Sequence, residues 1–281
     1  MSSAESQPAP RLKAPPGTWD VHMHVYEPGY AIAPTATSKP HDAPTSEYLK
    51  VRKNLGIAHT VVVQPSAYGK DNSCTIAAMK MMGPDSRGIA VADESITDAE
   101  FERLHAAGIR GLRFFFFAGG FLKWEMVAPL TARIQRLGWH AIVQFDGREF
   151  PAREEMLKRL PGTIIIDHVG KFIEPVKPDD PAFKSFLRVV DTGRFYVKLS
   201  APYETSKIGP PNYDDVGALA KALVKAAPER MLWASNWPYV ATPKERIPKD
   251  TWMLDMLLDW APDEAVRKKI LVDNPARLYA K

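Results

Sequence analysis

The sequence contains a single cysteine, Cys74, among its 281 residues. One cysteine cannot form an intrachain disulfide, so the chain fits a reducing cytoplasm better than a disulfide-stabilised secreted protein. The surrounding segment DNSCTIAAMKMM is typical of a helix face, and Cys74 is therefore not expected to act as a nucleophile.

Long apolar runs and basic clusters are also absent from the sequence. No stretch approaches the roughly 20 apolar residues of a membrane span, and the initial segment MSSAESQPAPRLKAPPG lacks the apolar core of a secretory signal. The formal net charge is only +4, with no basic run interleaved with aromatic residues, so nucleic acid is not an expected partner. This small positive charge is compatible with an anionic small-molecule substrate, and the sequence leaves homo-oligomer formation open.

The sequence does contain short apolar runs that alternate with amphipathic stretches. Eight runs predict strands, several of them apolar throughout, as is typical of parallel strands covered on both faces. The predicted strands are residues 18–25, 59–65, 87–92, 109–115, 139–145, 163–169, 194–200 and 230–236. Helical patterns occur at residues 45–56, 71–82, 97–108, 126–138, 215–230 and 262–279.

This alternation predicts a single α/β domain folded as a (β/α)₈ TIM-like barrel. An open doubly wound sheet is disfavoured because no G-x-G-x-x-G segment follows a predicted strand. We place the barrel at residues 18–281 and expect the Pro-rich residues 1–17 to form a flexible arm. Cap-type residues Thr45 and Thr97 mark the expected starts of two helices.

Three histidines occur near the carboxyl ends of predicted strands, where barrels of this class carry their chemistry. His22 and His24 alternate in WDVHMHV, so the period of two places both on one side of the strand, and His168 follows IIID. A single histidine in an apolar strand is usually structural, but three at strand ends favour a functional site. We interpret the remaining histidines as structural or solvated: His41, His59, His105 and His140.

Other polar residues are expected at the same end of the barrel. Arg113 interrupts GLRFFFF and would be costly to bury unpaired, so it either pairs with a protein carboxylate or binds an anionic ligand. Asp146 precedes Gly147 and could be only a turn residue. The remaining polar residues at the strand ends are Gln64, Ser66, Gln144, Asp167, Lys171, Lys198, Ser200, Tyr203, Glu204, Ser235, Asn236 and Tyr239.

Several segments together resemble the amidohydrolase superfamily, and within it the branch of 2-pyrone-4,6-dicarboxylate lactonase and D-galactarolactone isomerase. They are DVHMHV, GIAHTVVVQPSAYGKDN, GIRGLRFFF, IIIDHVGK, LWASNWPY and NPARLY, and VQFDG, DHVGKF and YETS look closer to the isomerase. The resemblance runs from about Gly17 to Tyr279. It implies a distorted eight-stranded barrel that acts on lactones of dicarboxylic acids.

The resemblance places the histidines of the family at His22, His24 and His168. It implies that Ser66, Arg113 and Lys171 bind and position a carboxylate of the substrate. The chain also departs from both patterns. Asn236 stands where the lactonase has an aspartate, although the isomerase tolerates asparagine there. Tyr239 replaces a histidine that usually follows Trp-Pro in the isomerase, and the isomerase lacks the first histidine of the pair, which this chain keeps.

The same comparison argues against a required metal. Superfamily members with two metals use a modified lysine on the fourth strand, histidines on the fifth and sixth, and an aspartate on the eighth. Here the corresponding strands offer Arg113, no histidine on the fifth, and Asn236. Three histidines can bind zinc in principle, but the metal-bound water would lack its usual base. We therefore expect no metal and no other cofactor.

Asn236 also bears on the type of reaction. An amide cannot deprotonate water near neutral pH, whereas a hydroxyl of the substrate held beside its own lactone carbonyl needs less activation. We therefore expect lactone isomerisation, with His22, His24 and His168 polarising the carbonyl and Asn236 orienting a hydroxyl. The predicted substrate-binding residues are Ser66, Arg113, Gln144, Asp146, Lys171 and Tyr239.

Three alternatives remain open at this point. The first is lactone hydrolysis with His168 or Asp146 as the base. The second is a metal-dependent hydrolase or decarboxylase of the same superfamily. The third is a barrel that binds an acidic ligand without turning it over.

Overall fold

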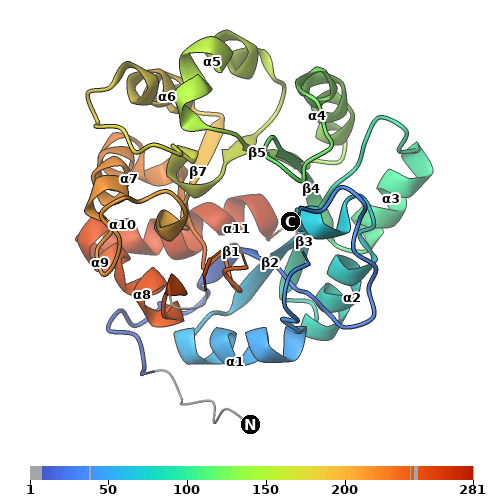
Figure 1. Ribbon diagram of the computed structural model, residues 1–281, viewed down its shortest axis with the longest axis horizontal. Coiled ribbons are helices and arrows are strands. Elements are labelled where there is room, and N and C mark those ends of the chain that lie inside the picture. The colour runs from blue at the N-terminus through green and yellow to red at the C-terminus, as the bar shows by residue number, and fades with distance from the viewer. Residues whose placement is uncertain (1–7, 38, 241, 244–245, 281) are drawn as a thin grey trace.

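Eight parallel strands form a nearly closed barrel in the computed structural model, which describes residues 8–37, 39–240, 242–243 and 246–280 (Figure 1). The strands are hydrogen-bonded in chain order from β1 to β8, which confirms the predicted (β/α)₈ architecture. They are β1 Trp19–Met23, β2 His59–Val63, β3 Ser86–Ala90, β4 Ile109–Phe115, β5 His140–Gln144, β6 Ile164–Ile166, β7 Phe195–Leu199 and β8 Met231–Trp233.

Most helices surround the strands on the outside, whereas α11 lies across the centre of the view in Figure 1. The helices are α1 Thr45–Leu55, α2 Ser73–Met82, α3 Asp98–Ala106, α4 Val127–Gln135, α5 Phe150–Arg159, α6 Pro181–Asp191, α7 Asp214–Ala226, α8 Asp250–Asp255, α9 Leu257–Trp260, α10 Glu264–Lys268 and α11 Asn274–Tyr279. As predicted, the Thr97 side chain caps α3 by accepting the Glu100 N–H. Thr45 instead begins α1 itself, after Pro44, and its N–H is bound by the Glu27 carboxylate.

The barrel is irregular around β1, which meets β8 at the seam of the barrel. The pairing of β1 with β2 shifts register between Asp20 and Met23. Across the seam, the Asn236 N–H donates to the His22 carbonyl oxygen at 2.9 Å. The buried Asp20 carboxylate adds bonds from the Ser235 N–H at 3.0 Å and the Ser235 hydroxyl at 2.5 Å. The seam therefore fixes the positions of two residues expected at the site, His22 and Asn236.

The amino-terminal end of the barrel is filled by packed aromatic side chains. Trp19, the first residue of β1, stacks on Tyr279 of α11, with ring centroids 5.7 Å apart. The Tyr279 hydroxyl is hydrogen-bonded to His140 Nε2 at 3.1 Å, at the start of β5. The interior is thus closed by α11 at the amino-terminal end of the strands, which leaves the carboxyl end for polar side chains.

Part of the expected N-terminal arm is anchored. Leu12 is buried, and its N–H donates to the Asp255 carboxylate of α8 at 2.8 Å. Arg11 pairs with the same carboxylate at 3.3 Å. The first part of the expected arm, residues 1–7, lies outside the described residues. Within the described ranges, no helix combines the length and apolar character needed to cross a membrane.

Candidate active site

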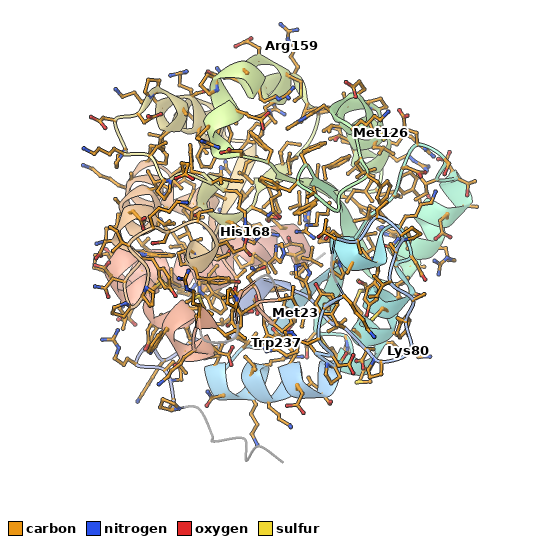
Figure 2. All side chains as sticks on the ribbon, in the orientation of Figure 1. Met23, Lys80, Met126, Arg159, His168 and Trp237 are labelled. Carbon is orange, nitrogen blue, oxygen red and sulfur yellow. The ribbon has the colours of Figure 1, made fainter. Side chains whose placement is uncertain are left out.

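A cavity of about 220 Å³ opens at the carboxyl ends of the strands. Figure 2 shows His168 near the centre of the ring of strands, whereas Arg159 and Lys80 lie at the periphery. Eight of the ten predicted site residues line this cavity: His24, Ser66, Arg113, Gln144, His168, Lys171, Asn236 and Tyr239. The other two, His22 and Asp146, do not line it.

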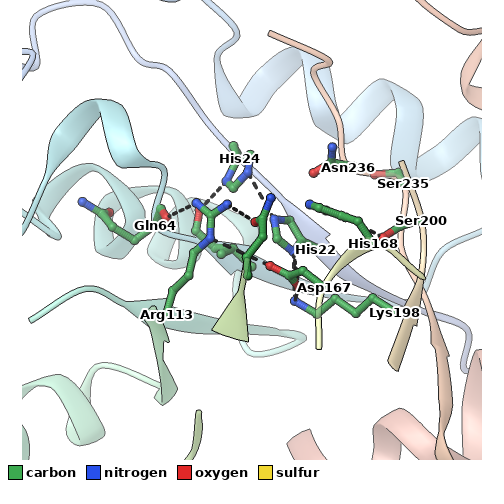
Figure 3. A network of polar contacts seen from close by, with 12 residues as sticks. His22, His24, Gln64, Arg113, Asp167, His168, Lys198, Ser200, Ser235 and Asn236 are labelled. Atoms are coloured by element: carbon green, nitrogen blue, oxygen red, sulfur yellow. Dashed lines mark hydrogen bonds and ion pairs between the residues drawn. The ribbon is translucent and has the colours of Figure 1, made fainter. Parts of the chain in front are cut away.

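His22 and His24 belong to a chain of hydrogen bonds that crosses the barrel interior (Figure 3). His24 Nδ1 lies 2.7 Å from the Val63 carbonyl oxygen, so this nitrogen carries the proton. His24 Nε2 is then an acceptor for the His22 Nε2–H, 3.2 Å away. His22 Nδ1 in turn accepts from the Lys198 ammonium at 2.8 Å. One proton arrangement therefore satisfies the whole chain.

The site histidines are held in the neutral form. Burial is the main cause, because it disfavours the charged imidazolium. Burial and the Arg113 guanidinium lower the pKa of His24 to about 3. Burial, with Lys198 as the next contributor, lowers the pKa of His22 well below its usual value, and burial does the same for the pKa of His168.

His168 lines the cavity, and one of its ring nitrogens has no hydrogen-bond partner among the described residues. Its Nδ1 is hydrogen-bonded to the Ser200 hydroxyl at 2.9 Å, which leaves Nε2 for a ligand. Its backbone is left-handed, with φ 52°, and a non-glycine residue in this region is usually held there by its surroundings. The turn is secured by the Gly170 N–H, which donates to the Asp167 carbonyl at 3.0 Å.

Asp167 and Lys198 form an ion pair that the sequence did not assign to a role. Both side chains are fully buried, and Lys198 Nζ lies 3.0 Å from the Asp167 carboxylate. Burial alone would raise the pKa of Asp167, but Lys198, His168 and Arg113 together lower it. The only sequence signal for this pair was a charged residue at the end of each of two predicted strands.

Arg113 is buried but is not neutralised by a close carboxylate. Its guanidinium donates to the Gln64 carbonyl at 3.1 Å and to Gln144 Oε1 at 2.8 Å. Its Nε is 3.9 Å from the nearest Asp167 oxygen. Because two of its partners are neutral and it faces the cavity, Arg113 keeps a positive charge there for an anionic ligand.

Asn236 is oriented by a carboxylate. Its Nδ2 donates to Glu204 at 2.8 Å and to the Tyr203 hydroxyl at 2.7 Å, which identifies this end of the amide as the donor. Its Oδ1 is buried, and no residue in the described part of the chain hydrogen-bonds to it. The φ of 58° lies in the left-handed region, which asparagine tolerates better than most residues. Oδ1 is therefore a buried acceptor without a partner among the described residues.

Lys171 also faces the cavity and contacts the Glu204 carboxylate in an ion pair. Burial and the nearby Arg113 lower the pKa of Lys171 to about 7, although Asp167 acts in the opposite direction. Glu204 lines the same cavity, so it meets Asn236 and Lys171 at the cavity wall. The sequence had only placed Glu204 beyond the seventh strand.

The remaining predicted residues are placed as follows. Tyr239 lines the cavity, but its hydroxyl is buried and donates to Asp250 at 2.8 Å. The Asp146 carboxylate accepts the Arg148 backbone N–H at 3.1 Å, which caps a turn outside the cavity, and it also accepts from the Arg148 Nε at 2.8 Å. This matches the turn interpretation of Asp146 and gives no support to a role in binding.

The other histidines do not line the cavity. His41 is exposed, His59 stacks on Trp19, His105 accepts from Trp139 Nε1, and His140 contacts Tyr279. These environments agree with the structural or solvated interpretation.

The donor set does not fit a resident metal ion. His22, Asp167 and His168 each bring one potential ligand atom to within 4.8 Å of the others. However, the Lys198 ammonium already lies 2.8 Å from His22 Nδ1 and 3.0 Å from the Asp167 carboxylate. With His22 Nδ1 accepting from Lys198, its Nε2 carries a proton and cannot bind a metal. A divalent cation would also lie beside a second cation, Arg113.

Comparison with known proteins agrees with this architecture. The family model described as amidohydrolase matches residues 19–281. The chain is 34% identical to 2-pyrone-4,6-dicarboxylate hydrolase of Comamonas testosteroni, covering 96% of this chain and 92% of the relative. It is 31% identical to D-galactarolactone isomerase of Agrobacterium fabrum, covering 96% and 94%. An apo crystal structure from Agrobacterium tumefaciens, 30% identical, matches with a TM-score of 0.93 over 98% of both chains. The chain therefore belongs to the amidohydrolase family.

Proposed function

We propose that this protein is a metal-independent lactone isomerase that acts on hydroxylated lactones of dicarboxylic acids. The observation that carries the proposal is Asn236 at the cavity wall, with its donor end bound by Glu204 and its buried Oδ1 unpartnered among the described residues. An amide here cannot take a proton from water, but it can accept a hydrogen bond from a substrate hydroxyl. The relatives named D-galactarolactone isomerase and 2-pyrone-4,6-dicarboxylate hydrolase support the substrate class.

In this proposal His168 polarises the lactone carbonyl. If the Ser200 hydroxyl donates to Nδ1, Nε2 carries the proton and donates to the carbonyl oxygen, where charge develops as the tetrahedral intermediate forms. His22 and His24 have no such free N–H, because their protons are used by His24 Nε2 and by the Val63 carbonyl. They therefore position the site, together with Lys198, rather than polarise the carbonyl directly.

Arg113 binds a carboxylate of the substrate. Its geometry is set by Gln144 and by the Gln64 carbonyl, and it faces the cavity. A carboxylate forms charge-assisted hydrogen bonds with such a guanidinium, and the pair is bidentate when both carboxylate oxygens reach it. Ser66 lies at the same cavity wall and is available as a further hydrogen-bonding group.

The reaction then requires no external water. A substrate hydroxyl attacks the polarised carbonyl, and the ring oxygen leaves as a new hydroxyl. A hydroxyl already held beside the carbonyl can have an effective molarity on the order of 10⁵ M or more, so this attack outcompetes water. A lactone with one ring size is thereby exchanged for a lactone with another.

The test is to incubate the purified protein with a panel of sugar-acid and pyrone lactones and to follow the products by NMR. A second lactone without free diacid is the expected product. Release of free diacid without a second lactone would replace this function with hydrolysis. Activity that is unchanged by chelation, in protein purified without added metal, is expected in addition.

A further inference from the structure

Glu204 lies in the cavity wall without a part in the steps described so far. One carboxylate oxygen accepts the Asn236 Nδ2–H at 2.8 Å, and the other contacts the Lys171 ammonium. These two contacts hold the side chain in place. It is 16% exposed and lines the cavity. Asn236 replaces the carboxylate expected on the eighth strand, and Glu204 brings a carboxylate to within hydrogen-bond distance of that amide.

We propose that Glu204 is the general base and general acid of the isomerisation. This inference rests on the proposed function. A carboxylate oxygen has more than one lone pair, so Glu204 can accept a substrate O–H while it keeps the bond from Asn236. In this proposal an adjacent hydroxyl of the same polyhydroxylated substrate bonds to the Asn236 Oδ1, which is buried and has no partner among the described residues. This bond holds the attacking group beside Glu204.

Glu204 alone can accept and return the one proton that the reaction transfers. In the first step the attacking O–H bond breaks, its proton moves to Glu204, and a new C–O bond forms at the carbonyl carbon. The oxyanion then collapses, the original ring C–O bond breaks, and the leaving oxygen takes the same proton back from Glu204. Since the carboxylate is regenerated in each turnover, no water and no second base are consumed.

Lys171 has a positioning role in this arrangement. Its contact holds the second carboxylate oxygen, so that Glu204 cannot rotate away from Asn236. The arrangement predicts different consequences for the two partners. Loss of the Glu204 carboxylate removes the proton acceptor. Loss of Lys171 leaves the acceptor in place but holds its carboxylate less firmly.

The test compares Glu204→Gln with Lys171→Met in the lactone interconversion assay. Glutamine keeps an oxygen that accepts from Asn236, so the fold is retained, which thermal unfolding checks. The expected result is a fall in kcat of about 100-fold or more for Glu204→Gln, with KM within about threefold of the wild-type value. For Lys171→Met, the expected fall in kcat is less than about tenfold. A Glu204→Gln variant with kcat within about threefold of wild type overturns the inference, as does an equal loss in both variants.

The double variant Asn236→Asp/Glu204→Gln provides a second readout. It exchanges the carboxylate and the amide while keeping a hydrogen bond between the two positions. Recovery of at least about tenfold over Glu204→Gln is expected if a carboxylate at this wall is what the reaction needs, and no recovery counts against it.

Reactions in ¹⁸O-labelled water separate this inference from the proposed function. If the wild-type protein forms labelled diacid and the Glu204→Gln variant does not, Glu204 is still the base, but the reaction is hydrolysis. A wild-type protein that converts no lactone overturns both proposals. A wild-type isomerase whose rate is indifferent to Glu204→Gln overturns the role of Glu204 alone.

Discussion

Lys198 donates a hydrogen bond to His22 across the barrel interior, with 2.8 Å between Nζ and Nδ1. This contact determines which nitrogen of His22 is protonated, and the resulting His22 Nε2–H donates to His24 Nε2, whose tautomer is set by the Val63 carbonyl. A lysine on β7 thus sets the tautomer of a histidine on β1, which in turn donates to a histidine just beyond the end of that strand. Figure 3 shows how Lys198, His22 and Asp167 come together.

Replacing Lys198 with methionine is expected to destabilise the fold. Asp167 would lose a partner 3.0 Å away and remain buried as an incompletely compensated charge. The free energy of unfolding should fall by about 3–5 kcal/mol, measured by urea denaturation. The double variant Lys198→Met/Asp167→Asn removes both charges and should recover more than half of that loss. A single variant as stable as the wild type would contradict the pairing.

His168→Asn is expected to lower kcat for lactone conversion about 100-fold or more while the protein remains folded. The variant loses the N–H that we propose donates to the developing oxyanion. His140→Gln is the matched control, because His140 is a buried histidine at the opposite end of the barrel. Its kcat, corrected for the folded fraction, should match the wild type. Equal losses of kcat in both variants would argue for a general folding defect.

The free energy of unfolding is expected to fall as the pH is lowered, in part through His140. Burial and Lys198 lower the pKa of His140 to about 3, whereas an unfolded histidine titrates near about 6.5. Between these values the unfolded chain binds more protons, so stability rises with pH and is lost as the pH falls below about 6.5. His140→Gln should reduce this slope by up to about 1.4 kcal/mol per pH unit. Urea denaturation from about pH 7 to about pH 4 measures it, with the exposed His41→Gln as control.

Arg113→Met is expected to raise KM for a lactone with a free carboxylate about 100-fold, because the variant loses a charge-assisted bond in a buried site. The methyl ester of the same lactone lacks the negative charge and should be affected by less than about tenfold. Arg110→Met, on the same strand but outside the cavity, is the matched control. Equal effects on the acid and its ester would contradict carboxylate binding by Arg113.

The barrel and much of its site follow from the sequence, because each depends on local patterns. Apolar runs predicted all eight strands, although the β-strands are shorter than the predicted runs at several ends. The alternation of strand residues predicted that His22 and His24 lie on one side. The expectation that polar residues gather at the carboxyl ends of the strands placed His168 near them, as the structure has it. The resemblance to the amidohydrolase branch is borne out by the family match.

The partnerships within the site could not be read from the sequence in the same way. Asp146 and Asp167 both follow apolar strands, yet Asp146 turns to Arg148, two residues away, and Asp167 turns inward to Lys198. That choice depends on local turn geometry and on the stagger between β6 and β7. Glu204 lies in a turn beyond a strand, where no periodicity indicates its direction.

Tyr279 closes the amino-terminal end of the barrel by stacking on Trp19 of β1. It lies in α11, which follows all eight strands in the sequence. During translation the strands therefore emerge before the residue that seals them from below. The base of the nascent barrel therefore stays open and apolar until Tyr279 has been synthesised and α11 has packed against it, so the barrel cannot finish folding before then. The proposed site at the carboxyl end of the strands thus depends on a closure at the opposite end that forms only after all eight strands.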